Sequence, residues 1–266
     1  QNGAKLLIQQ HGACYGTAIY SFFEQHELKI CDRYFSWGWG KNNPKIQAIP
    51  APVRRCKQKQ KYQSDGKFLI ICGSAGRYLS QLQSDTHYGS RAEHYAAHLI
   101  RILEVVHMCS KKQVMVKLFP DEKDRGKPLG PTISSMYPSA HLINNTDSFS
   151  ELVISSSLCI HTYNGTPFLE GLALEHPCIL VNDDNLTTVR NSAKPFFALL
   201  KNAGIYHENV SSLKSFMQQN RGKIMEWWTK ANVVDARVKF CQEFVLSPKN
   251  QKSQLHRKIR EIICTE

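Results

Sequence analysis

The feature that most constrains the fold is a regular alternation of strand-like and helix-like segments from residue 67 to about residue 208. Short apolar runs such as KFLIIC and PCILVN have the length and composition of buried strands, and amphipathic stretches separate them. Strands that alternate with helices are joined by crossover connections, which favour one parallel sheet covered by helices. We therefore predict an α/β protein built on a Rossmann-like parallel sheet.

A second, shorter alternation precedes this one. The segments AKLLIQ, TAIYSFFEQHELKI and CDRYFSW predict a strand, a helix over residues 17–30 and another strand. The run IQAIPAPVRR and the lysine- and glutamine-rich residues after it, as far as Gly66, are typical of a linker. We therefore predict three parts: the end of an N-terminal domain with its linker over 1–64, a larger Rossmann-like domain over 65–245, and a C-terminal helix over 246–266 that is a candidate to cross back.

The composition excludes several classes of protein. The 266 residues are 42% hydrophobic and 21% charged, which is ordinary for a globular chain. No window has the roughly 18 uninterrupted apolar residues that a membrane helix needs. There is no initiating Met and no signal peptide, so we expect a piece of a longer polypeptide. Nine cysteines without a CxxC or a paired spacing indicate reduced thiols, which favour the cytoplasm, and disfavour a zinc site.

The net charge of +12 implies attraction to an anionic partner. Basic clusters such as RRCKQKQK and KNQKSQLHRKIR are not interleaved with aromatic residues, and no nucleic-acid-binding motif is present, so we do not expect nucleic acid as a partner. Three explanations stay open: a solvated basic face, a phosphorylated substrate, and peripheral binding to the anionic inner face of a membrane.

The most informative motif is LCIHTYNGTPFLEGLALEHPCILV, residues 158–181. A predicted strand ends in Asn164, Gly165 and Thr166, and a predicted helix begins at once. Glycine lets backbone approach a ligand closely, and the N–H groups of a helix start, together with the Thr166 hydroxyl, form an anion-binding corner. Glu170, one turn further on, is placed to accept hydrogen bonds from sugar or ribose hydroxyls. From spacing alone, a capped turn with a surface glutamate explains the pattern equally well.

This motif resembles the donor site of GT-B glycosyltransferases and of the related sugar-nucleotide 2-epimerases. The blocks QHGACYG, DRYFSWGWG, VRNSAKPFFALLKNAGIYHE and WWTKANVVDARVKFCQEF occur in this order in a family of transferases from bacterial surface-polysaccharide (O-antigen-like) gene clusters. The similarity runs from about residue 5 to residue 245.

The resemblance implies a GT-B architecture, with two Rossmann-like domains that face a cleft and no obligatory metal. It also implies that the C-terminal domain binds most of the nucleotide and that much of the acceptor-side domain lies outside this chain. The chain departs from the pattern at two places. Ala13 and Cys14 fill a loop that is expected to be richer in glycine, and Gly165 stands where serine is expected.

The stretch QQHG ends the first predicted strand. By the resemblance, this strand end lies at the cleft, so we predict that His11 acts as a general base on an acceptor hydroxyl or donates to a donor phosphate. Asp32 or Glu24 is the expected partner that orients His11. The same His-Gly layout resembles the polyol-phosphate transferases of teichoic acid synthesis. We call Asn164, Gly165 and Thr166 the donor turn. His161, inside the strand before this turn, is expected to be a packed core residue.

Transfer from a nucleotide sugar builds negative charge on the departing phosphate, so cations should face that phosphate. Arg77, Lys117, Arg125 and Arg190 all fall in strand-end loops, where open α/β sheets bind ligands. Arg77 and Lys117 are the preferred pair because each follows an apolar strand directly. For each cation taken alone, a solvated surface charge is the slightly better explanation.

The leading hypothesis is a glycosyltransferase that uses a nucleotide-sugar donor and a glycan or lipid-linked acceptor, with neither cofactor nor metal. Three alternatives stay open. A CDP-polyol phosphotransferase is favoured by the His-Gly loop, but no clear second histidine lies near the donor turn. A hydrolysing epimerase would need more carboxylates near the cleft. A truncated chain that binds nucleotide without turnover is the non-enzymatic alternative.

Overall fold

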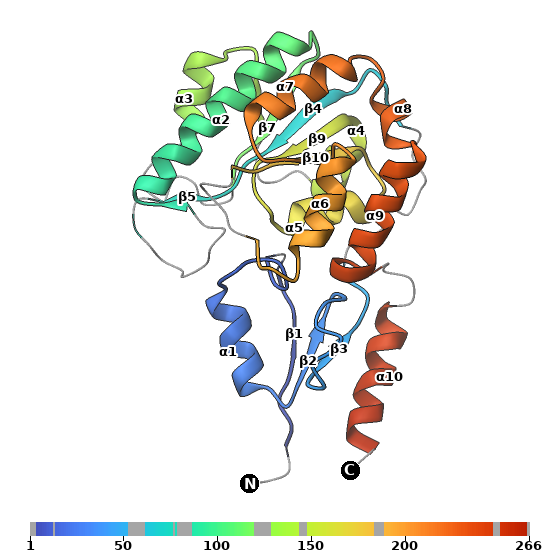
Figure 1. Ribbon diagram of the computed structural model, residues 1–266. Coiled ribbons are helices and arrows are strands. Elements are labelled where there is room, and N and C mark those ends of the chain that lie inside the picture. Colours follow the sequence, from blue (N-terminus) through green and yellow to red (C-terminus); the bar gives the residue numbers. More distant parts are fainter. Residues whose placement is uncertain are drawn as a thin grey trace.

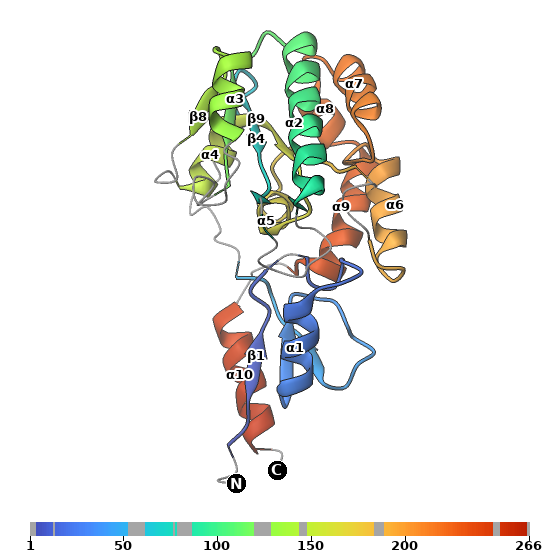
Figure 2. The ribbon, with the colours of Figure 1, turned by 90° about the vertical axis from the view of Figure 1, so that its left-hand side faces the viewer.

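The chain folds into a large α/β unit and a smaller unit that lies beneath it (Figure 1). The structure is a computed structural model and describes residues 4–12, 14–52, 62–76, 78, 87–119, 129–143, 148–183, 189–246 and 251–264. The first strand and the last helix both belong to the small unit (Figures 1 and 2). The chain therefore leaves the small unit, builds the large one, and returns.

Six parallel strands form the large sheet, in the order β11-β10-β9-β4-β7-β8. Their bounds are Lys67–Ile71 (β4), Val114–Lys117 (β7), His141–Ile143 (β8), Ser156–His161 (β9), Cys178–Val181 (β10) and Tyr206–His207 (β11). Every residue of β9 and β10 is buried, as expected for strands covered on both faces. The predicted Rossmann-like sheet is confirmed. Its strand order reverses between β4 and β9, so a ligand crevice is expected at the carboxyl ends of these two strands.

Eight helices surround this sheet in the described part of the chain. They are Ser90–Cys109 (α2), Leu129–Met136 (α3), Phe149–Ser155 (α4), Thr166–Ala173 (α5), Lys194–Asn202 (α6), Val210–Gln219 (α7), Ile224–Trp228 (α8) and Ala231–Phe244 (α9). Helix α2 packs beside α7, and α9 packs against α5 and α6. A further parallel ribbon joins Ala75–Gly76 (β5) to His87–Tyr88 (β6).

The small unit is a three-stranded parallel sheet in the order β1-β2-β3, with one helix after its first strand. Its elements are Leu7–Gln9 (β1), Phe22–Ile30 (α1), Arg33–Ser36 (β2) and Ile46–Ala48 (β3). The two units are joined by a short antiparallel bridge between Ala18 and Val189.

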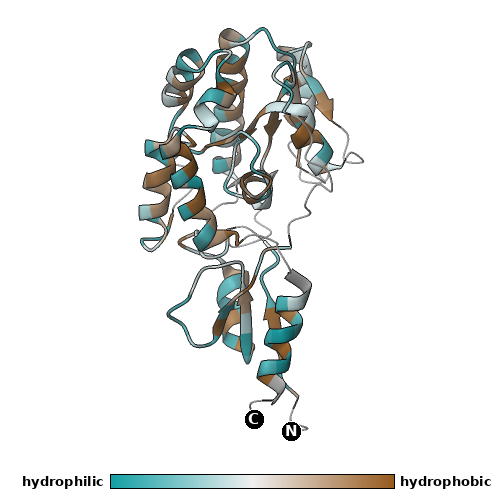
Figure 3. Cartoon of the chain, turned by 90° about the vertical axis from the view of Figure 1, so that its right-hand side faces the viewer, coloured by the Kyte–Doolittle hydropathy of each residue, from teal (hydrophilic) through white to brown (hydrophobic). Residues whose placement is uncertain are grey.

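Helix α10, Gln251–Cys264, lies against the small unit (Figure 2). Leu255, Ile259 and Ile262 recur at helical spacing and form a cluster with Phe35 of β2 and with Ile49. Figure 3 shows the corresponding alternation of hydrophobic and hydrophilic positions along this helix. The last helix therefore crosses back from the large unit to the small one.

The structure differs from the sequence-based prediction at two places in the small unit. The helix predicted from residue 17 begins at Phe22, because the Ser21 hydroxyl caps it by accepting a hydrogen bond from the backbone N–H of Glu24 at 3.4 Å. Part of the predicted linker is strand β3, which pairs with β2 and is partly buried. The lysine-rich remainder of that linker, residues 53–61, lies outside the described residues.

Three buried histidines should make the fold sensitive to acid. Burial lowers the pKa of His161 to about 3 and the pKa values of His176 and His207 to about 4 each. The unfolded chain, in which histidine has its ordinary pKa near 6.5, then binds more protons than the folded chain below that pH. These histidines therefore do not lower the free energy of unfolding above pH 6.5. On acidification toward pH 4 that free energy falls, by up to about 1.4 kcal/mol per pH unit for each histidine.

A urea titration at pH 7.5 and at pH 5 measures this loss, and His161→Leu identifies one source of it. Neither ring nitrogen of His161 has a hydrogen-bond partner among the described residues, so leucine removes a buried polar group without breaking a bond. We expect the variant to be more stable than the parent by about 2 kcal/mol at pH 5, with a smaller difference at pH 7.5. An equal pH dependence in the two proteins would contradict this assignment.

Candidate active site

A cavity of about 460 Å³ opens between the two units. It is lined by His11, which follows β1, and by Thr166 and Glu170 of α5, together with Gln9, Gln10, Trp37 and Pro52. Figures 1 and 2 both show the carboxyl end of β1 beneath the start of α5. The structure thus brings the predicted base and two predicted donor-binding residues into one cavity, although they lie far apart in the sequence.

Gln10 explains why the first strand stops at QQHG. Its buried side-chain oxygen accepts hydrogen bonds from the backbone N–H of Trp37 at 3.0 Å and from the Trp39 indole at 2.7 Å. Its side-chain amide donates to the carbonyl oxygen of Gly12. Gln10 therefore ties the turn after β1 to the turn after β2 and holds the backbone around His11 in place. This role of Gln10 was not predicted from the sequence.

The imidazole of His11 is oriented by Glu27 and Tyr15. The Nδ1 atom of His11 lies 3.3 Å from Oε1 of Glu27, and the Tyr15 hydroxyl lies 3.2 Å from the same nitrogen. Tyr15 and Tyr34 each donate to one oxygen of Glu27 at 3.1 Å. A carboxylate beside Nδ1 favours the proton on that nitrogen, which leaves the lone pair on Nε2, 3.3 Å from the same Tyr15 hydroxyl.

The expectation that Asp32 or Glu24 orients His11 is wrong. Asp32 accepts from the backbone N–H of Leu6, and Glu24 is occupied by Arg190 and by the backbone N–H of Gly16. Glu27 reaches His11 because it lies one helical turn after Glu24, on the part of α1 that faces β1 and β2.

Both tyrosines around Glu27 stay protonated. Burial, and next to it the charge of Glu27, raise the pKa of the Tyr15 and Tyr34 hydroxyls well above the ordinary value. They therefore act as hydrogen-bond donors that fix the carboxylate. The His11 side chain itself is 62% exposed, so it remains accessible from the cavity.

The donor turn follows β9 and starts α5, as predicted. Gly165 is the N-cap residue and has no capping side chain, and Pro167 stands in the first turn, where no backbone N–H is needed. A Cβ atom on Gly165 would lie 2.0 Å from the Tyr163 ring, so the ring occupies the space that the expected serine would need. The amide nitrogen of Asn164 donates to the Thr17 hydroxyl at 2.9 Å and so connects this turn to the small unit.

The four cations predicted to face a phosphate have different positions. Arg77 and Arg125 lie outside the described residues. Lys117 ends β7 at the same carboxyl edge of the sheet, but it is separated from β9 by β4 and does not line the described cavity.

Arg190 has a protein partner in place of the predicted phosphate. Its guanidinium binds both oxygens of Glu24 at 2.8 and 2.9 Å, and its Nε atom donates to the carbonyl of Ala18 at 2.8 Å. Glu24 is buried, and three-quarters of the Arg190 side chain is covered as well. This geometry indicates that Arg190 joins the two units.

The turn after β4 is a further candidate part of the site that was not predicted from the sequence. The backbone N–H of Gly73 donates to the Tyr95 hydroxyl, which also contacts the Thr162 hydroxyl at 2.6 Å. The Ser74 hydroxyl is buried and has no hydrogen-bond partner among the described residues. Because β4 and β9 flank the point where the strand order reverses, this turn lies beside the donor turn. The signal for it was a run of small residues directly after an apolar strand.

No group of three or more potential metal ligands occurs among the residues that the structure describes. His161 is completely buried beneath α5, as expected for a core residue, and its ring meets Phe168 edge to face.

The sequence matches the LIC12162 family transferase group over residues 1–259, and the chain belongs to this family. No curated protein matches the chain. The chain is therefore a transferase by family.

Solved structures share its fold at low identity. The wall teichoic acid polymerase TagF is 12% identical, with a TM-score of 0.50 over 99% of this chain and 70% of that one. Anabaena Alr3699/HepE, solved with UDP and glucose, is 12% identical, with a TM-score of 0.54 over 96% and 71%. MurG of Acinetobacter baumannii is 11% identical, with a TM-score of 0.51 over 97% and 67%. These likenesses confirm the predicted GT-B architecture.

Proposed function

We propose that this transferase moves a sugar from a nucleotide-sugar donor to a hydroxyl of a surface-polysaccharide or lipid-linked acceptor. The observation that supports this proposal is the shared cavity, in which His11 of the small unit faces Thr166 and Glu170 at the start of α5. A base on one side and a helix N-terminus on the other suit a hydroxyl that attacks a carbon bearing a phosphate leaving group.

In the proposed reaction, Nε2 of His11 removes the proton of the acceptor hydroxyl. The hydroxyl oxygen forms a bond to the anomeric carbon, and the bond between that carbon and the phosphate oxygen breaks. The nucleoside diphosphate leaves with the electron pair. The backbone N–H groups at the start of α5 and the Thr166 hydroxyl stabilise its charge, and Glu170 accepts hydrogen bonds from sugar or ribose hydroxyls. We propose that the reaction needs no resident cofactor and no metal.

The fold neighbours support the nature of the donor. HepE was solved with UDP and glucose, and a second HepE structure, at a TM-score of 0.52, contains UDP-glucose. This chain spans about seven-tenths of the HepE and TagF chains, so the activity of a longer protein is itself part of the proposal.

A second candidate is transfer of a polyol phosphate from a CDP-linked donor. The fold similarity to the wall teichoic acid polymerase TagF and the position of His11 and Gly12 directly after β1 favour it. The two reactions differ in the bond that breaks, at the anomeric carbon in one and at phosphorus in the other. The base of the nucleotide that binds separates the two hypotheses.

We also propose a cytoplasmic location, with peripheral contact at the inner face of the membrane. None of the seven cysteines whose side chains the structure describes forms a disulfide, and six of them are buried, as suits a reducing compartment. Within the described ranges, no helix has the length and apolar character needed to cross a membrane.

Calorimetric titration with CMP, CDP, UDP and GDP tests the donor site. We expect one nucleotide to bind and Glu170→Ala to weaken that binding by about tenfold or more, because a hydrogen bond to a charged group contributes about 1.5 to 3 kcal/mol. Binding of UDP or GDP supports sugar transfer, whereas CDP alone supports the polyol-phosphate alternative.

Glu104→Ala is the matched control. Glu104 is an exposed glutamate on α2 and does not line the cavity, so its replacement should leave nucleotide affinity unchanged. Equal affinity of the parent and Glu170→Ala for the bound nucleotide would contradict the proposed donor site.

A further inference from the structure

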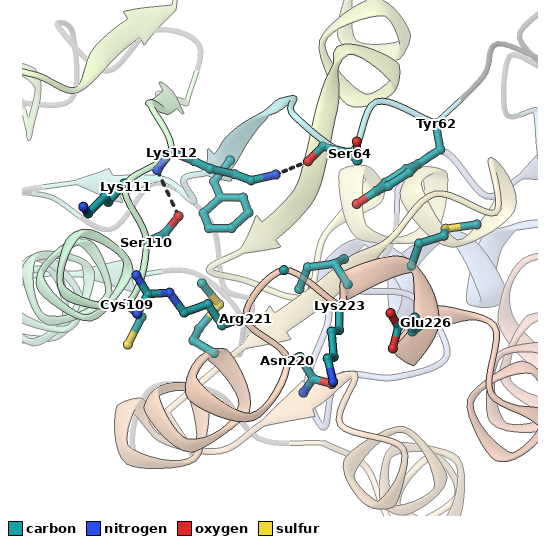
Figure 4. Close-up of a pocket in the computed structure, with 15 residues that line it drawn as sticks. Tyr62, Ser64, Cys109, Ser110, Lys111, Lys112, Asn220, Arg221, Lys223 and Glu226 are labelled. Carbon is teal, nitrogen blue, oxygen red and sulfur yellow. Dashed lines mark hydrogen bonds between the residues drawn. The ribbon is translucent and has the colours of Figure 1, made fainter.

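We propose that a second cavity of the large unit, apart from the active site, binds a phosphate-bearing anion. This cavity has a volume of about 430 Å³. Four cations line it, Lys111 and Lys112 from one side and Arg221 and Lys223 from the other, together with a single carboxylate, Glu226 (Figure 4). The inference does not rest on the proposed function.

The cavity lies at the amino ends of the parallel strands, and the active site lies at their carboxyl ends. Lys111 and Lys112 come just before β7, and Phe68 of the cavity wall stands at the beginning of β4. The donor turn and the turn after β4 lie beyond the carboxyl ends of the parallel strands. A ligand in the second cavity is thus separated from the active site by the length of these strands.

Three of the four cations have no side-chain partner in the described part of the chain. Lys111, Arg221 and Lys223 form neither an ion pair nor a side-chain hydrogen bond with any residue that the structure describes. Lys112, by contrast, is held by the carbonyl of Ser64 and, at 3.0 Å, by the Ser157 hydroxyl. One cation is therefore fixed in the wall, and three point their charge at solvent or at a ligand.

Helix ends do not account for this charge. Helices α2 and α7 both end at the cavity, and each C-terminus is equivalent to about half a negative charge. Together with Glu226 they oppose about two of the four positive charges, and the charge of Asp65, which acts on Lys112, opposes a third. About one positive charge remains for an external anion.

The chemistry of the lining defines the ligand. Guanidinium and ammonium groups bind phosphate oxygens through charge-assisted hydrogen bonds. The cavity is within the usual size range of about 300 to 1,000 Å³ for small-molecule sites. Phe68, Met217 and Ile224 supply an apolar floor, and Met225 on the rim is 38% exposed. Two kinds of ligand carry a phosphate that suits this lining: a soluble phosphate compound and the headgroup of an anionic phospholipid.

Lysine acetylation read by mass spectrometry locates the site. With pyrophosphate present, we expect acetylation of Lys111 and Lys223 to fall by about threefold or more, because a bound anion holds the amine in contact and hinders its reaction. In parallel, sedimentation with phosphatidylglycerol vesicles, compared with phosphatidylcholine vesicles, tests the lipid source. Protection by pyrophosphate alone identifies a soluble ligand. Binding to the anionic vesicles alone identifies a lipid headgroup.

The double variant Arg221→Glu with Lys223→Glu tests the residues. Both side chains are exposed on a turn that Gly222 makes with a φ of +72°, so charge reversal should not disturb packing. We expect anion binding to weaken by about tenfold or more, because repulsion replaces attraction at two positions. The control, Lys214→Glu with Lys230→Glu, makes the same change in net charge at exposed positions outside the cavity and should bind as the parent does.

Two results would overturn the proposal. The first is no protection of Lys111 and Lys223 together with no preference for anionic vesicles. The second is equal loss of binding in the double variant and its control, which would mean attraction to net charge alone. Because acetylation is read residue by residue, failure of nucleotide binding at Glu170 leaves this test intact.

Discussion

Replacing His11 with alanine is expected to lower turnover by about 10²- to 10⁴-fold, the usual contribution of a general base. The nucleotide should bind as tightly as before, because the donor contacts that we propose come from α5 and not from β1. The physical reason is that Nε2 of His11 is the base that we propose, with Glu27 3.3 Å from Nδ1, so the variant lacks the acceptor that we assign to the proton of the attacking hydroxyl. Steady-state turnover of the donor identified by calorimetry measures the effect.

His26→Ala is the control for this experiment. His26 is an exposed histidine on the same unit, and its ring stacks on Phe22 at a centroid distance of 5.8 Å, away from the cavity lining. Its replacement should leave turnover within about twofold of the parent, as for most exposed positions. Full activity of His11→Ala would remove His11 from the mechanism. Loss of nucleotide binding in that variant would instead place His11 at the donor phosphate, the second role predicted for it.

Replacing Arg190 with alanine is expected to lower the free energy of unfolding by about 3 kcal/mol, because it leaves a buried carboxylate unpaired. Glu24 is 4% exposed and its carboxylate receives two hydrogen bonds from Arg190, so its bond to the backbone N–H of Gly16 is the one that remains among the described residues in the variant. We choose the lower end of the range for buried pairs because the Arg190 side chain is 25% exposed. Urea unfolding at pH 7.5 gives the value.

A double-mutant cycle with Glu24→Ala separates the ion pair from other effects. The loss of stability in the double variant should be clearly smaller than the sum of the losses in the two single variants. The reason is that the double variant has neither charge, so no buried charge is left without its partner. Simple additivity would contradict a direct interaction between Glu24 and Arg190. If Arg190 instead serves a donor phosphate, Arg190→Ala weakens nucleotide binding and leaves the unfolding free energy unchanged.

The donor side of the candidate site could be predicted because its signals are local. The strand that ends at His161 and the helix that begins at Thr166 are adjacent in the sequence, and each shows its own hydrophobic pattern. The acceptor side of the site was harder to predict from the sequence. His11 was found through the strand that precedes it, but its partner Glu27 depends on how α1 packs on β1 and β2, which no local pattern encodes.

The partner of Arg190 also could not be predicted from the sequence. In the sequence it is one of several cations in strand-end loops, and only the approach of the small unit gives it Glu24 as a partner. The two-residue pairing at Ala18 and Val189 that brings the units together has no sequence signature.

The sequence did not predict helix α3 or the ribbon of β5 and β6. By itself, it determined the α/β class, most of the alternation of strands and helices in the large unit, and the turn that starts α5. These follow from hydrophobic periodicity, capping and glycine positions, which act over a few neighbouring residues. Only the tertiary structure decided that Glu27 serves His11, that Arg190 joins the two units, and that four cations surround a second cavity. Charged side chains are compatible with water nearly anywhere on a surface, so their partners depend on which distant segments the packed core brings together.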